Sequence, residues 1–334
     1  MKSQYVKELA EGTRVESEFA VSSREIRATR HGDAYLSLEL SDRTGRVPAV
    51  HFRPDAVASR TPVGSVVRVS GTVTSYRGLK RISVDRLRPA RTFDPDDLLG
   101  SGPRDADEML SELRELAGGV RDRALRSVLR AVFGDEEFLA RFTTCPGSQS
   151  HHHAYRTGLL EHTVAVAAMC SSVAERYAGC DRDLLVCAAL LHDIGKVFEL
   201  EHSSTIEYSD QGRLLGHVVL GDRHVQAAIA RSRLKVPTET QDRLSHAILS
   251  HHGELEWGSP KRPSSIEALL LHHIDNLDAK AAGFVEIARG AIAADERWTD
   301  AQNLFRRPLY APVPFEDQRA APVLEDEQYH PVSA

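Results

Sequence analysis

Histidine and aspartate residues of this chain stand at spacings that suit metal chemistry. The most specific segment is 192–196 (HDIGK), which follows an apolar run at 184–191. An adjacent imidazole and carboxylate at a helix end can bind a metal, the glycine permits a turn, and Lys196 suits an anion such as a phosphate. The alternative interpretation is a helix terminus that carries an exposed charge pair.

Further candidate ligands lie where predicted helices begin or end. The whole set comprises His162, His192, Asp193, His217, His251, His252 and Asp275. Imidazoles and carboxylates are the usual ligands of manganese, iron, zinc or cobalt, and a carboxylate can bridge two ions. Two such ions can clamp a phosphate and lower the pKa of a shared water molecule. Because the set contains no cysteine, it favours a hydrolytic site over a structural zinc site.

Other residues near these candidates have an ordinary explanation as well as a functional one. The run at 151–153 (HHH) could extend the metal site or meet the substrate, and a polar loop explains it equally well. Asp278 and Lys280 follow Asp275 on the same predicted helix. They could support the ligand from behind, or they could form an ion pair on the helix face.

Most of the candidates belong to a region with helical periodicity. Helices are predicted at 105–117, 120–132, 135–142, 160–178, 183–191, 216–232, 238–250 and 265–293. Residues 93–104 (FDPDDLLGSGPR) are polar and rich in Asp, Gly and Pro, which is typical of a linker. Residues 313–334 contain few apolar side chains and are expected to form a loosely ordered acidic tail.

The first part of the chain has the alternation of strands instead. Strands are predicted at 34–40, 47–52, 66–74 and 81–87, separated by Gly and Pro. Short strands with this punctuation predict a small all-β barrel. The expected organisation is therefore a barrel domain at 1–92, a linker at 93–104 and an all-α domain at 105–312.

Composition supports two domains and a cytoplasmic location. The 334 residues are 41% hydrophobic and 27% charged, which is ordinary for a globular protein with room for two cores. The N-terminus lacks the apolar segment of a signal peptide, and no run of 18 apolar residues would span a membrane. The four cysteines lack C-x-x-C spacing and are expected to be reduced.

Charge is segregated along the chain. Residues 1–92 carry a net charge of +7, whereas the remainder carries −13. A basic first third joined to an acidic remainder indicates one part that approaches phosphates and another that binds cations.

The motifs together resemble a known family. The segments concerned are 155–163 (YRTGLLEHT), 190–196 (LLHDIGK), 216–217 (GH), 249–253 (LSHHG) and 274–280 (IDNLDAK). Their order is similar to that of HD-domain phosphohydrolases, and more closely to the YhaM-like 3′-to-5′ exoribonucleases, in which an OB-fold precedes an HD domain. The resemblance extends to Tyr310 and leaves out only the tail.

This resemblance implies the roles of individual residues. One metal would be held by His162, His192, Asp193 and Asp275, and Asp193 would bridge to a second metal held by His217 and by His251, His252 or both. Lys196 would contact the scissile phosphate, so Asp193 and Lys196 are the candidate catalytic residues. The implied cofactors are two divalent ions, manganese first, with iron or cobalt as alternatives.

The barrel would bind the nucleic acid. Single-strand binders of the OB type combine a basic groove with aromatic platforms. Strand alternation and the resemblance select Tyr35, Phe52, Tyr76, Arg77, Lys80 and Arg81. A solvated arginine-rich surface, or packing of the aromatic rings on the helical domain, would explain the same residues.

The leading hypothesis is hydrolysis of single-stranded RNA, or DNA, from the 3′ end to nucleoside 5′-monophosphates, without a membrane partner. A nucleotidase or cyclic-nucleotide phosphodiesterase with a regulatory barrel is the first alternative. The second is a non-catalytic nucleic-acid-binding protein with structural metals. The sequence leaves open which metal is bound, whether RNA or DNA is preferred, and which oligomeric state the protein adopts. A homo-oligomer is one of the alternatives.

Overall fold

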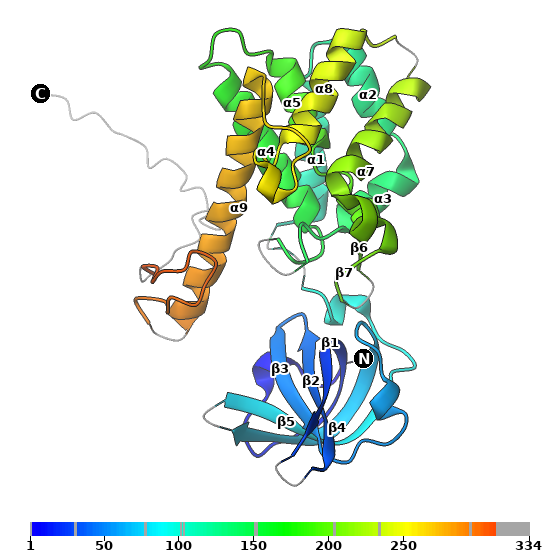
Figure 1. The fold of residues 1–334 in the computed structure, drawn as a ribbon, viewed down its shortest axis with the longest axis vertical. Helices are drawn as coiled ribbons and strands as arrows, with labels where there is room; N and C mark the ends of the chain where they lie inside the picture. The colour runs from blue at the N-terminus through cyan, green and yellow to red at the C-terminus, as the bar shows by residue number, and fades with distance from the viewer. Residues whose placement is uncertain are drawn as a thin grey trace, which may run out of the picture. The chain divides into compact units, whose positions relative to one another are not determined.

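The computed structural model describes residues 2–311, except 30–31, 77–78, 101, 103, 150–152, 203–204, 233–234 and 294–295. The predicted tail at 313–334 and Arg77 therefore lie outside the described residues. Residues 1–279 and the residues from Lys280 onward form separate compact units. Figure 1 shows the barrel strands in blue and cyan and the helices that follow them along the chain.

The N-terminal strands close into a barrel in the order β1-β2-β3-β5-β4. They are β1 (Arg14–Ala28), β2 (Ala34–Asp42), β3 (Gly45–His51), β4 (Val66–Tyr76) and β5 (Leu79–Pro89). Strand β3 pairs with β5 in parallel, and the other neighbours pair in the antiparallel sense. This topology confirms the predicted OB-fold.

Strand β1 was absent from the sequence-based prediction. It pairs with β2 along its second half and with β4 along its first half, and it bends at an irregularity between Val21 and Ser23. Most side chains after Val21 are exposed, whereas Ser17 is buried although it is polar. The alternation of apolar and polar side chains is therefore weak in β1. The strand is recognised in the structure by its backbone pairing with β2 and β4.

Alternation along the other strands separates an apolar interior from a polar exterior. In β2 the buried residues are Leu36, Leu38 and Leu40, while Tyr35 lies on the opposite face. The barrel has its own hydrophobic core, distinct from the core of the helical region. Each region therefore buries enough apolar surface for a core of its own.

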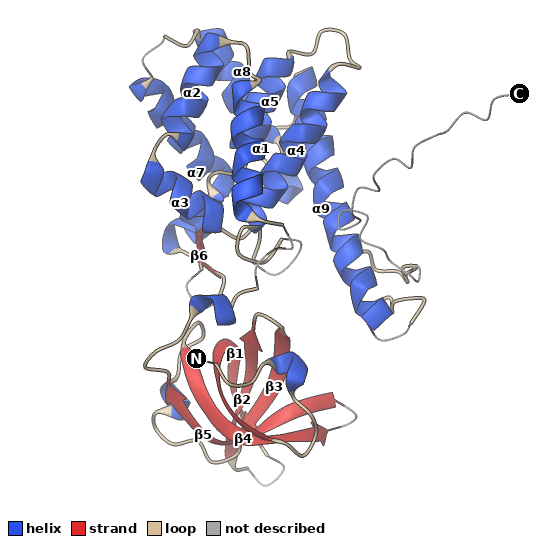
Figure 2. Cartoon of the chain, turned by 180° about the vertical axis from the view of Figure 1, so that it is seen from behind, coloured by secondary structure: helices blue, strands red, loops and turns tan. Residues whose placement is uncertain are grey.

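The helices of the described residues closely match the predicted ones. They are α1 (Ala106–Gly118), α2 (Arg123–Phe133), α3 (Glu136–Thr144), α4 (Gly158–Ala174), α5 (Arg182–Leu191), α6 (Lys196–Glu199), α7 (Asp210–Arg231), α8 (Thr238–Ser250) and α9 (Ile266–Ala293). The short helix α6, the pair β6 (Leu200–Glu201) and β7 (Glu207–Tyr208), and the first turns of α7 were not predicted. Figure 2 shows this helical part in blue.

Helices α4 and α5 form the centre of the helical core. Every residue of α5 from Leu184 to Leu191 is buried, and the two helices pack closely along their length. Residues 192–195, which follow α5, are buried as well. Among the described residues, no helix has both the length and the hydrophobicity needed to cross a bilayer.

Candidate active site

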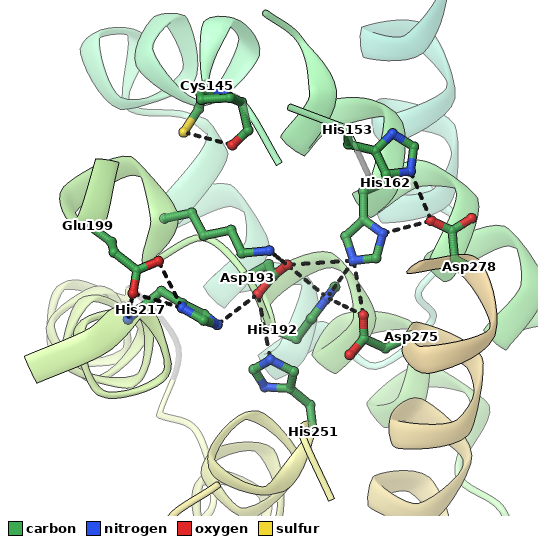
Figure 3. Close-up of polar contacts among 12 residues, drawn as sticks. Cys145, His153, His162, His192, Asp193, Glu199, His217, His251, Asp275 and Asp278 are labelled. Atoms are coloured by element: carbon green, nitrogen blue, oxygen red, sulfur yellow. Dashed lines mark hydrogen bonds and ion pairs between the residues drawn. The ribbon is translucent and has the colours of Figure 1, made fainter. Parts of the chain in front are cut away.

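The ends of several helices bring the predicted ligands into one cluster, and Figure 3 shows the members of this cluster other than His252. His192 and Asp193 follow the last residue of α5, and His251 and His252 follow the last residue of α8. His162 belongs to the first turns of α4, His217 follows a break in α7, and Asp275 lies on α9. Residues separated by more than 100 positions in sequence therefore face one another.

The carboxylate of Asp193 lies at the centre of this cluster and is 2% exposed. Its Oδ2 atom is 3.5 Å from Nε2 of His162 and 3.5 Å from Nε2 of His192. Its Oδ1 atom is 3.4 Å from Nε2 of His217 and 3.5 Å from Nε2 of His251. The carboxylate thus presents one oxygen to each of two groups of imidazoles.

The first group also contains Asp275. Nε2 of His162 is 3.2 Å from Nε2 of His192 and 3.1 Å from Oδ1 of Asp275. Nε2 of His192 is 3.8 Å from the same Asp275 oxygen. Two nitrogens that each lie about 2.1 Å from one ion are separated by roughly 3.0–3.4 Å, so the spacing of these imidazoles suits a shared metal.

The second group contains both members of the histidine pair. Nε2 of His217 is 3.2 Å from Nε2 of His252, and His251 faces Asp193 from the same side. The ligating nitrogens of His217, His251 and His252 lie close enough together to hold one ion. The sequence left open which member of the pair points inward, and in the structure both of them do.

The other ring nitrogen of each of these histidines has an oxygen partner. Nδ1 of His162 lies 2.7 Å from Asp278, and Nδ1 of His217 lies 2.9 Å from Glu199. In the remaining three histidines, Nδ1 donates to a backbone carbonyl oxygen. The pairs are His192 with Ala189, His251 with Ile248, and His252 with Trp257. An imidazole that donates from Nδ1 offers Nε2 as its ligand atom, so all of these rings are oriented toward the cluster.

Two buried atoms test whether a cation fits here. Oδ1 of Asp193 and Nε2 of His251 are buried and have no hydrogen-bond partner among the described residues. Both are acceptors, because burial lowers the pKa of His251 and keeps its ring neutral. Buried acceptors that face each other without a donor are unfavourable, and a cation between them removes that cost. The residues therefore fit a divalent metal.

The charges of the cluster shift the pKa values of its members. Burial alone lowers the pKa of His162, but contacts with Asp275 and Asp278 outweigh burial and raise the pKa to about 10. Burial and the neighbouring His251 and His217 lower the pKa of His252 to about 3. Although burial opposes ionisation of Asp193, Lys196 and the imidazoles hold its pKa well below the usual range.

Lys196 supplies an ammonium group to the site. Its Nζ atom lies 2.5 Å from Oδ2 of Asp193. Burial lowers the pKa of Lys196, but Asp193 outweighs burial and raises the pKa above its ordinary value. The side chain remains charged on the wall of a cavity of about 500 Å³, whose lining also includes Tyr208 and Trp257.

The glycine in the HDIGK segment has a second role besides the predicted turn. Gly195 lies in the turn at 192–195 that joins α5 to α6, although its backbone angles are right-handed and do not require glycine. A Cβ atom on Gly195 would collide with the carbonyl oxygen of His217, so the residue allows α7 to approach Asp193. A second change of direction occurs at Gly216, where φ is +70° in the left-handed region that favours glycine.

Two residues outside the predicted set support the ligands. Glu199 accepts hydrogen bonds from the backbone N–H and from the ring of His217, and no sequence pattern had indicated it. Asp278 contacts both His162 and His153, and His153 in turn contacts Tyr155. Of the two explanations for Asp278, support of a ligand from behind agrees with these contacts. His151 and His152 lie outside the described residues.

The candidate nucleic-acid residues of the barrel form two aromatic sites. The rings of Tyr35 and Phe52 are 5.7 Å apart, and Phe52 is 46% exposed. The guanidinium group of Arg81 lies 4.6 Å from the ring of Tyr76, which is 53% exposed. Nζ of Lys80 donates a hydrogen bond to the carbonyl of Leu9, so this lysine also contacts the N-terminal segment.

Models of two protein families match the two domains. The HD domain family matches residues 159–280, and the family of OB-fold nucleic acid binding domains named for tRNA anti-codon binding matches residues 20–90. Among solved structures, the second OB-fold domain of replication protein A from Methanococcus maripaludis aligns with 28% of this chain and 99% of that one. Its sequence identity is 21% and its TM-score is 0.23.

Curated relatives are similar along most of the chain. The 3′-5′ exoribonuclease YhaM of Bacillus velezensis is 32% identical over 273 residues, which cover 80% of this chain and 86% of that protein. The enzyme of the same name from Bacillus licheniformis is 31% identical over 308 residues, which cover 90% and 96% of the two chains. This chain therefore belongs to the YhaM family of 3′-5′ exoribonucleases.

Proposed function

We propose that this protein is a metal-dependent enzyme that degrades single-stranded RNA from the 3′ end to nucleoside 5′-monophosphates. The observation that carries the proposal is the buried Asp193 carboxylate, which offers one oxygen to each of two groups of inward-facing imidazoles. Membership of the YhaM family supports the same activity.

Two divalent ions are the proposed cofactors. One would be held by His162, His192, Asp193 and Asp275. The other would be held by Asp193, His217, His251 and His252. Nitrogen and carboxylate ligands without a thiolate favour manganese, with iron or cobalt as alternatives. When bound, such ions polarise a phosphate and lower the pKa of a water molecule.

The walls of the cavity suit the terminal nucleotide. A volume of about 500 Å³ is in the range of small-ligand sites. The rings of Tyr208 and Trp257 are partly exposed on its lining and offer surfaces on which a base can stack. The ammonium group of Lys196 is suited to a non-bridging oxygen of the scissile phosphate.

The barrel would hold the RNA upstream of the 3′ end. The proposed contacts are Tyr35, Phe52, Tyr76, Arg77, Lys80 and Arg81. Exposed rings beside guanidinium groups combine stacking with attraction to the phosphate backbone. Because the region at 1–92 carries a net charge of +7, binding should weaken as the salt concentration rises.

The test is hydrolysis of 5′-labelled single-stranded RNA by metal-free protein, with Mn²⁺ added or withheld. We expect a Mn²⁺-dependent ladder that shortens from the 3′ end, and no ladder with Asp193→Ala. Intact RNA under all metals tried, with hydrolysis of free nucleotides, would instead identify a small-nucleotide phosphohydrolase. RNA binding without turnover of either substrate would identify a non-catalytic binding protein.

A further inference from the structure

A second hollow of the helical region lies away from the metal cluster. It has a volume of about 670 Å³ and lies between α2 and the C-terminal end of α7. Its lining consists of Arg123, Arg126, Ser127, Arg130, Ala131, Arg231 and Ser232. Positive charge therefore dominates this hollow.

Among the described residues, the arginines of the hollow have no acidic partners. Arg123, Arg126 and Arg130 follow one another at spacings of three and four residues, which places them on one face of α2, and Arg231 ends α7. In the part of the chain that the structure describes, none of these four makes an ion pair with a carboxylate. Like charges that line one hollow repel one another, so a bound anion would reduce that repulsion.

The hollow lies in a domain that is acidic as a whole. The chain after residue 92 carries a net charge of −13, so carboxylates are abundant there. Other arginines of the same domain are paired with them: Arg104 with Glu112, Arg182 with Asp183, and Arg243 with both Glu267 and Asp181. In the hollow, by contrast, four arginines share one lining that contains no acidic residue among the described ones.

The chemistry of the lining indicates the kind of anion. Guanidinium groups bind phosphate oxygens through paired hydrogen bonds. The hydroxyl groups of Ser127 and Ser232 lie 2.7 Å apart at the same wall and offer further polar contacts. The volume of the hollow is in the range of small-ligand sites, and several cations require a ligand with more than one negative charge.

The position of the hollow separates it from the metal cluster. His217 and Arg231 belong to the same continuous stretch of α7, and fourteen residues of helix span roughly 21 Å. In Figure 1, α2 lies at the end of the helical part remote from β6 and β7. A ligand in the hollow would therefore not contact the proposed catalytic cavity.

We propose that this hollow is a second anion-binding site, which binds a small ligand with more than one phosphate group. This inference does not depend on the proposed ribonuclease activity. The observations that carry it are the four arginines that line one hollow, the absence of carboxylate partners among the described residues, and the compact volume. A compact hollow suits a small polyphosphate better than an extended RNA strand.

Calorimetric titration of the metal-loaded full-length protein with inorganic tripolyphosphate tests the proposal. The double variant Arg126→Gln with Arg130→Gln should weaken tripolyphosphate binding at least about tenfold. Each substitution removes charged hydrogen bonds to the phosphate groups, and one such bond contributes about tenfold or more to affinity. Arg231→Gln, on the other helix, should weaken it as well. Arg223→Gln removes the same charge from an exposed position of α7 outside the hollow and should bind like the unmodified protein.

The design separates this site from the metal cluster and from RNA binding. Tripolyphosphate that reaches the metals does so equally in all four proteins, so only the difference between them reports on the hollow. The rate of RNA hydrolysis should be unchanged in the double variant. Equal tripolyphosphate affinity in all proteins would overturn the proposal. Normal tripolyphosphate affinity with weakened RNA binding would overturn it too, because the arginines would then serve the RNA backbone.

Discussion

Nδ1 of His162 lies 2.7 Å from Oδ2 of Asp278, and this contact orients the imidazole toward the metal cluster. Asp278→Asn should lower the affinity for Mn²⁺ about 10- to 100-fold, because supporting carboxylates of this kind orient a ligand and raise its basicity. Competition with a chelating dye measures the affinity. Asp242→Asn, exposed on α8, makes the same charge change and should have no effect; an equal loss there would contradict the assigned role.

The same carboxylates predict how metal binding depends on pH. Burial lowers the pKa of His162, but Asp275 and Asp278 outweigh burial and raise the pKa to about 10. In metal-free protein His162 is therefore protonated at neutral pH, and an ion must displace that proton. Affinity should rise with pH, by about tenfold per unit for one proton. Titration in buffers of different ionisation enthalpy counts the protons, and a count of zero would contradict this prediction.

Removal of the central carboxylate should separate catalysis from RNA binding. Asp193→Ala is expected to reduce the rate of hydrolysis by more than about a thousandfold. The variant lacks the carboxylate whose two oxygens face the two groups of imidazoles. Affinity for long RNA should remain close to that of the unmodified protein, because the barrel is unchanged. Gel analysis gives the rate and filter binding gives the affinity. A variant that still cleaves at the normal rate would refute the assignment of Asp193.

Loss of the lysine should affect the rate more than the metal content. Lys196→Met is expected to lower kcat about 10²- to 10³-fold, the typical loss when one preorganised charge is removed from an active site. Metal analysis should find the unmodified stoichiometry. Lys261→Met, at an exposed position of a loop, serves as the control. A large change in metal content with Lys196→Met would show that the lysine mainly stabilises the cluster.

The aromatic site at the ends of β4 and β5 predicts dependence on RNA length. Tyr76→Ala with Arg81→Gln should raise KM for long RNA by the equivalent of about 1–3 kcal/mol, the typical contribution of one stacked base. Dinucleotides, which have no upstream nucleotides for the barrel to bind, should be cleaved normally. Steady-state rates on substrates of graded length make the comparison. Equal losses on long and short substrates would argue against a binding role for the barrel.

Local patterns in the sequence were sufficient for the helices and for the types of ligand. The apolar run that forms α5 predicts a buried helix. His192 and Asp193 directly follow this run in the sequence, so they must lie at the end of the helix. Strand β1 was missed because its partners in β4 lie about 50 positions later, and much of its own surface is exposed. Pairing between distant strands leaves little trace in the local alternation of side chains.

Tertiary packing decided how the ligands face one another. By itself, the sequence determined that imidazoles and carboxylates were available at helix ends, since residue type and helical period are local properties. Only the folded chain decided that both His251 and His252 point inward, that Glu199 supports His217, and that Gly195 serves a close approach of backbones. Those relationships depend on the distance between segments far apart in the chain, and that distance is determined by how the whole core packs.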